Sequence, residues 1–147
     1  MTLSPEQKIC EECLGGRIRM LNRVVTKIYD EKLRPLGLRS SQIGILITVA
    51  AHGPLSQTQV CQRLQLEKST LSRDLTRILA KGWIVSTAEQ GRRGKLEVTP
   101  AGRALIKKLA PVWTEAQAKA CKLLGKTLIN EIYRVADELQ LVCNIEN

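Results

Sequence analysis

Apolar residues recur every three or four positions along most of the chain, which is the spacing of amphipathic helices. The first such segment predicts one helix from about Glu6 to Leu33. Its apolar seam consists of Leu14, Ile18, Leu21, Val25 and Ile28. The last segment repeats the same spacing at Leu128, Ile132, Val135, Leu139 and Val142. Continuous seams of this length predict helices that pack against a partner surface.

Shorter helices are predicted between these two segments. A helix that starts at Ser40 or Ser41 is expected to be buried on most sides, because the residues from Ile43 to Ala51 are almost all apolar. Ser56 and Gln59 match a capping box, in which each side chain bonds the backbone of the other residue, so a short helix is expected to begin there. A second short helix follows after a tight turn. Its predicted apolar face consists of Leu71, Leu75, Ile78 and Leu79.

Two stretches after Gly82 have the composition of β-strands. Residues 83–87 and 95–98 are rich in β-branched and apolar residues, and the glycines between them allow a tight hairpin tip. Thr99 followed by Pro100 is a typical helix start and predicts a long final pair of helices. The chain is therefore expected to be mainly α-helical with one small β-hairpin wing, the arrangement of a winged helix-turn-helix.

Charge and composition then narrow the class of partner. Lys and Arg number 23 against 14 Asp and Glu, which gives a formal charge of +9 and an excess that attracts polyanions. No apolar run approaches the roughly 20 residues that span a bilayer, and the first residues lack the pattern of a secretory signal. We therefore expect a cytoplasmic protein with no membrane partner, whose five cysteines stay as thiols.

Hydroxyl and basic side chains lie opposite the leucines on the second short helix. Hydroxyls can contact phosphates or bases, and an arginine can donate two hydrogen bonds to guanine. A solvated polar face would explain this helix alone, but helix, turn, helix and basic hairpin in uninterrupted order indicate binding to double-stranded DNA. The candidate DNA-binding residues are Lys68, Ser69, Thr70, Ser72, Arg73, Arg77, Arg92, Arg93 and Lys95.

Several segments resemble the MarR family of bacterial transcriptional regulators. They are Leu36-Gly-Leu-Arg-Ser-Ser-Gln, Glu67-Lys-Ser-Thr-Leu-Ser-Arg-Asp-Leu, Lys81-Gly-Trp-Ile, Arg92-Arg93 and Leu96-Glu-Val-Thr-Pro-Ala-Gly-Arg. The resemblance implies a single domain over residues 1–147, with a winged helix-turn-helix at 38–100 and dimerisation helices at 1–34 and 101–147. It also implies that the major groove is read by Ser69, Thr70, Ser72 and Arg73.

The resemblance further implies a homodimer that acts as a repressor on a pseudo-palindromic operator. The expected dimerisation residues are Leu14, Ile18, Leu21, Leu128, Ile132, Val135 and Leu139. A small anionic or aromatic effector is expected to bind between the dimer helices and the winged domain and to release the DNA. Trp113 on the long helix is a candidate for this pocket, although packing alone would also explain it.

Two alternatives stay open at this point. Cys10 and Cys13 lie three positions apart on one face of the predicted first helix, and a peroxide-sensing branch of the MarR family uses a cysteine near this end. The protein could therefore be a thiol-based redox regulator, while cysteines packed in the dimer seam are the simpler interpretation. A nonspecific nucleoid-binding protein would account for the charge through phosphate contacts alone.

An enzyme is not expected. A thiol oxidoreductase normally has a strand before its Cys-x-x-Cys motif, and none precedes Cys10. With His52 as the single histidine, the chain offers no Ser-His-Asp set, and zinc would need about four ligands. No catalytic residue, metal or other cofactor is therefore expected.

Overall fold

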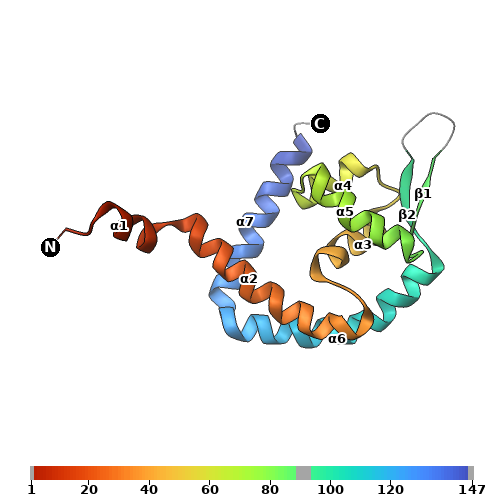
Figure 1. Ribbon diagram of the computed structural model, residues 1–147. Coiled ribbons are helices and arrows are strands. Elements are labelled where there is room, and N and C mark those ends of the chain that lie inside the picture. The colour runs from red at the N-terminus through yellow and green to blue at the C-terminus, as the bar shows by residue number, and fades with distance from the viewer. Residues whose placement is uncertain (1, 89–93, 146–147) are drawn as a thin grey trace.

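The computed structural model describes residues 2–88 and 94–145. Its elements, shown in Figure 1, are α1 (Pro5–Glu12), α2 (Leu14–Leu33), the 3-10 turn η1 (Arg34–Leu36), α3 (Ser40–His52), α4 (Gln57–Leu64), α5 (Lys68–Ala80), β1 (Ile84–Thr87), β2 (Lys95–Val98), α6 (Pro100–Leu124) and α7 (Lys126–Ile145). The expected class, mainly α with a two-stranded antiparallel hairpin, is confirmed. Among the described helices, none is long and apolar enough to cross a bilayer.

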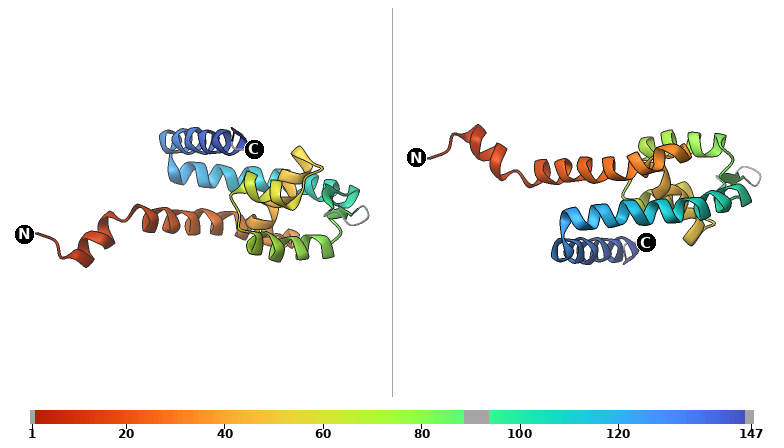
Figure 2. Two further views of the ribbon diagram at one scale, coloured as in Figure 1. Left: turned by 90° about the horizontal axis from the view of Figure 1, so that it is seen from above. Right: turned by 90° about the horizontal axis from the view of Figure 1, so that it is seen from below.

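The elements form two regions that share α6. One region contains α3, α4, α5 and the hairpin, and the other contains α2 beside the second half of α6 (Figure 1). α1 projects away from the rest of the chain, and α7 leaves the end of α6 and returns to contact α4 (Figure 2). One long helix therefore connects the predicted winged region to the predicted dimerisation helices.

The single helix expected from Glu6 to Leu33 is wrong, because the chain breaks at Cys13. Cys13 has an extended backbone, and its Sγ accepts a hydrogen bond from the N–H of Gly16 at 3.3 Å. Gly15 and Gly16 each cost about 0.5–1 kcal/mol relative to alanine inside a helix, so the chain caps a new helix here. The apolar spacing could not reveal the break, because the whole seam lies within α2.

The core of the winged region forms from the predicted faces of α3, α4 and α5. Ser56 caps α4 and Gln59 completes the capping box, as expected. Leu79 is an error in the predicted face of α5, since its side chain is exposed at the end of that helix. The buried residues of this core are Ile45, Leu46, Val49, Leu55, Val60, Cys61, Leu71, Leu75, Ile78, Ile84 and Leu96.

The start of α3 also differs from the expectation. Arg39, rather than Ser40 or Ser41, is the N-cap residue, and its backbone N–H donates to the Oε1 of the buried Gln42 at 3.1 Å. The backbone N–H of Ser40 donates to Asp30 Oδ1 on α2 at 2.7 Å. A carboxylate from a distant helix thus occupies the capping role, which explains why local sequence signals misplaced it.

The start of α6 packs directly beneath the hairpin. Thr99 caps the helix by accepting from the N–H of Gly102 at 3.0 Å, and its hydroxyl donates to the carbonyl of Gly82 at 2.6 Å. Gly102 is buried, and a Cβ at this position would lie 2.2 Å from the carbonyl oxygen of Trp83. Only glycine allows this close approach of the helix to the base of the hairpin.

A proline interrupts the hydrogen bonding within α6. Pro111 lies near the middle of this 25-residue helix, and proline has no N–H to donate to the carbonyl four residues earlier. The helix continues on both sides of Pro111, so this position is its weakest point for bending.

A polar chain joins the helices of the second region. The hydroxyl of Tyr29 on α2 donates to Gln117 Oε1 on α6, and Gln117 Nε2 donates to the hydroxyl of Tyr133 on α7 at 2.9 Å. Burial raises the pKa of Tyr29, with smaller contributions from nearby Cys121 and Tyr133, so this phenol keeps the proton that it donates. The chain fixes the relative positions of α2, α6 and α7.

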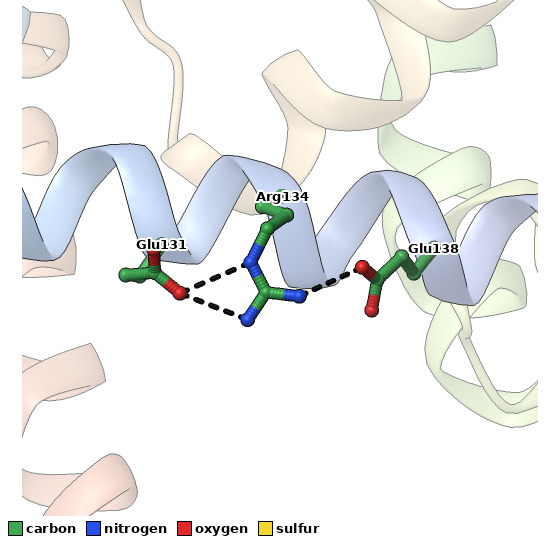
Figure 3. Close-up of polar contacts among 3 residues, drawn as sticks. All are labelled: Glu131, Arg134 and Glu138. Carbon is green, nitrogen blue, oxygen red and sulfur yellow. Dashed lines mark hydrogen bonds and ion pairs between the residues drawn. The ribbon is translucent and has the colours of Figure 1, made fainter.

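The two apolar seams are largely exposed in the single chain. In α2 only the C-terminal half packs, where Ile28 is buried against Ala116 and Ala120 of α6. On α7 the seam residues are exposed, and Arg134 beside them pairs with Glu131 at 2.8 Å and Glu138 at 2.7 Å (Figure 3). The exposed seam residues are Leu14, Ile18, Leu21, Leu128, Ile132, Val135 and Leu139.

Candidate nucleic-acid interface

The polar side of α5 faces away from the core, as the sequence predicts. Its leucines are buried, whereas the candidate DNA-binding residues on the opposite side are open to solvent, except that Thr70 is half-buried. Thr76 uses its hydroxyl to donate to the carbonyl of Ser72 at 2.8 Å, so the helix itself occupies that group. The exposed candidates on α5 are Lys68, Ser69, Ser72, Arg73 and Arg77.

A tight turn sets the angle between α4 and α5. Gln65 adopts a left-handed conformation with φ 52°, and the N–H of Leu66 donates to the carbonyl of Cys61 at 2.9 Å. Leu66 packs against the core of the winged region, which anchors the turn from below. The turn therefore projects the N-terminal end of α5, with its free N–H groups and positive dipole, away from the core.

The charges on this face are available to an external anion. Among the described residues, neither Arg73 nor Arg77 forms an ion pair with a carboxylate. An arginine without a carboxylate partner can donate two parallel hydrogen bonds to guanine or phosphate. The exposed side of α5 thus combines hydroxyl donors, arginine donors and a helix N-terminus.

The hairpin contributes one described candidate. Lys95 is exposed at the start of β2, which pairs antiparallel with β1 so that Lys95 lies opposite Thr87. Arg92 and Arg93 lie outside the described residues, so their predicted position on the wing stays a prediction. The base of the hairpin is buried through Ile84 and Leu96, which attaches the wing to the same core as α5.

An apolar cavity of about 410 Å³ lies between α3 and α6. Trp113 lines it with its side chain 44% exposed, which places this tryptophan where the sequence expects a pocket residue. Ile47 also lines it and is 37% exposed, although its apolar run predicts burial on most sides. The sequence gives no signal for the other lining residues, Ile43, Gly44, Thr48, Leu64, Ile106, Leu109 and Ala110, because they come from three separate helices.

The two N-terminal cysteines are not on one helix face. Cys10 is exposed on α1, and Cys13 is exposed at the break before α2, where its sulfur already accepts from a backbone N–H. The interpretation as a pair on one continuous helix is therefore wrong. Within the described part of the chain, no group of three or more His, Cys, Asp or Glu is placed to hold a metal ion.

The order α3, α4, turn, α5 and hairpin, with the polar side of α5 exposed, defines a winged helix-turn-helix protein. Residues 36–94 match the model of the MarR family, so the winged segment of this chain belongs to that family. The resemblance to MarR regulators that the sequence motifs indicate is confirmed.

Relatives of known sequence match the same region. The HTH-type transcriptional regulator YwoH of Bacillus subtilis is 32% identical over 82 residues, which are 56% of this chain and 60% of that protein. The multiple antibiotic resistance protein MarR of Salmonella typhimurium is 30% identical over 94 residues, which are 63% of this chain and 65% of that protein. The matched region thus spans less than two thirds of the length of either relative.

Solved structures share the fold over more of the chain. A probable transcriptional regulator from Pseudomonas aeruginosa has a TM-score of 0.76 at 21% identity and covers 88% of this chain and 98% of its own. The M. tuberculosis transcriptional regulator MosR has a TM-score of 0.74 at 25% identity and covers 88% and 97%. The helices outside the winged segment therefore also follow the architecture of these regulators.

Proposed function

We propose that the protein is a sequence-specific DNA-binding transcriptional regulator that acts as a homodimer. The observation that carries this proposal is the exposed row of Ser69, Ser72 and Arg73 on a helix whose other side is locked into the core. The matches to regulators over the winged segment support it. The proteins that this chain resembles are named as regulators, which also favours a binding protein over an enzyme.

Exposed apolar seams support the proposed homodimer. Leu14 is 71% exposed, Ile132 45% and Leu139 58%, and all lie on helices at the end of the molecule opposite the hairpin. Contiguous apolar surfaces of this kind normally mark protein interfaces, and a two-fold dimer would use the same surface on both copies. A second copy of the chain would therefore bury both seams and place two α5 helices for two half-sites.

Selection of DNA from a random pool by the purified protein tests this function. We expect an inverted repeat whose half-site centres are 10–10.5 base pairs apart or a multiple of that spacing, because two-fold dimers engage successive major grooves about 34–36 Å apart. In a promoter reporter, the selected site is expected to lower expression, as a repressor requires. Recovery of random sequences with equal affinity would contradict the proposal and favour nonspecific nucleoid binding.

The apolar cavity supports control by a small aromatic effector. The M. tuberculosis MarR family protein Rv2887 has been solved with p-aminosalicylic acid and with salicylic acid, and 6-hydroxynicotinic acid regulates DNA binding by BpsR of Bordetella bronchiseptica. In this chain the cavity lies between α3 of the winged region and α6, which continues to the proposed dimer surface. A ligand here would shift the equilibrium between DNA-binding and released spacings if it binds them unequally.

Salicylate is a suitable probe of this cavity. We expect it to weaken operator binding of the wild type within the 5–150-fold range typical of allosteric coupling. Ala110→Phe fills the cavity and is expected to abolish most of that response. Ala118→Phe, an exposed alanine on the same helix outside the cavity, is the matched control and is expected to retain it. Fluorescence of Trp113 reports binding directly.

The thiol alternative predicts a different result. Peroxide would release DNA from the wild type and spare a Cys10→Ser, Cys13→Ser variant. If this occurs while salicylate and a panel of phenols and carboxylates leave operator affinity unchanged, the effector proposal is wrong and the redox interpretation replaces it.

A further inference from the structure

A second hollow, of about 560 Å³, lies where η1, the start of α3 and the end of α5 meet. It shares no residue with the apolar cavity. Four cationic side chains line it, which we call the basic basin: Arg34, Arg39, Arg77 and Lys81. All four are exposed, and only Arg77 belongs to the candidate DNA-binding residues found from the sequence.

The charge of the basic basin is not balanced from within. Among the described residues, none of its four cations forms an ion pair. Asp30 is the one carboxylate that lines the hollow, and its Oδ1 already accepts the backbone N–H of Ser40 at 2.7 Å. Four cations around one engaged carboxylate create a positive potential that favours an anion from outside.

The basic basin continues the exposed row of α5. Ser69, Arg73, Arg77 and Lys81 recur every four positions, so they lie along one side of the helix and its C-cap. At a rise of 1.5 Å per residue, Arg73 and Lys81 are about 12 Å apart along the axis, close to the width of the major groove. A helix that places Arg73 at a base edge therefore brings the basic basin to the phosphate strand at the border of the groove.

We propose that the basic basin binds phosphate groups of the DNA backbone beside the groove that α5 reads. This inference rests on the proposed function and extends the contact surface beyond α5 to Arg34 and Arg39, which belong to η1 and the start of α3. Those two residues are far from α5 in sequence, and Asp30 positions them by fixing the first turn of α3. Phosphate contacts of this type add affinity for every sequence and fix the orientation of the reading helix.

A double variant, Arg34→Gln with Arg39→Gln, tests the basic basin without altering α5. We expect its affinity for the selected operator and for random duplex to fall by similar factors. The plot of log affinity against log salt should become shallower by about 1.8, because each lost phosphate contact removes about 0.9. Lys119→Gln with Lys122→Gln, which removes two exposed cations from the other end of α6, is the matched control and should leave the slope unchanged. Circular dichroism and thermal unfolding check that the variants fold.

The outcomes separate this inference from the proposed function. Wild-type protein that binds no selected site refutes the function itself. Wild-type binding with a basin variant whose salt slope equals that of the control refutes the basin alone. Inorganic phosphate, added at constant ionic strength, distinguishes a free ligand: if it raises the melting temperature of the wild type but not of the basin variant, and the DNA slopes are equal, the phosphate of DNA is not the occupant.

Discussion

Gly102→Ala is expected to lower the free energy of unfolding by about 1–3 kcal/mol, the usual cost of forcing an extra methyl group into a packed site. The new Cβ would lie 2.2 Å from the carbonyl oxygen of Trp83 and 2.8 Å from Cγ2 of Val98. Trp83 and Val98 sit at the two sides of the hairpin base, so α6 and the hairpin must separate to admit the methyl group. Urea unfolding followed by circular dichroism measures the change.

Gly44→Ala is the matched control for this prediction. Gly44 is also a helical glycine, but its nearest neighbour to an added Cβ is the Leu64 Cδ1 atom at 4.0 Å. Alanine there is expected to raise stability by about 0.5–1 kcal/mol, because it restricts the unfolded chain and favours the helix. Equal effects at Gly44 and Gly102 would show that α6 does not pack against the hairpin base as closely as described.

Arg73→Ala is expected to reduce discrimination between the selected operator and random DNA by about 1–3 kcal/mol, the value of one bidentate contact to a base. The side chain is exposed and has no carboxylate partner among the described residues, so its removal leaves no buried charge behind. Competition binding at fixed salt measures the two affinities. Loss of specificity, rather than a uniform loss of affinity, is the expected signature.

Lys95→Ala provides the contrast, since Lys95 lies on the hairpin and is expected to contact phosphate. It should weaken binding to all sequences by a similar factor and reduce the salt slope by about 0.9. If Arg73→Ala shows the same uniform loss, Arg73 contacts phosphate and another residue of α5 reads the bases.

The parts of the fold that depend on neighbours in sequence could be predicted. The capping box at Ser56 and Gln59, the glycine that ends α5 and the hairpin strands all depend on a few adjacent residues, and each is found where the pattern indicates. The exposed side of α5 follows from the same helical spacing. Local rules therefore gave the winged region and its candidate DNA-binding face.

Features that depend on distant residues could not be predicted in this way. Asp30 caps α3 from another helix, and the basic basin combines residues 34–39 with residues 77–81 only after the chain has folded. The break at Cys13 did have a local signal in Gly15 and Gly16, but the regular apolar seam outweighed it. Periodicity reports which side of a helix is apolar, and it carries no information on where that helix is interrupted.

Pro111 gives α6 the geometry of a lever with its fulcrum beside the apolar cavity. The lining residues Ile106 and Trp113 lie on opposite sides of this fulcrum. The arm from Pro111 to the helix start at Pro100 is about 16 Å long, so a bend of roughly 10° moves that start by about 3 Å. Because Gly102 is packed against the hairpin base, the hairpin travels with the arm. Two such arms in a two-fold dimer would change the separation of the DNA-binding surfaces by up to about 6 Å, a substantial part of a spacing of about 34 Å.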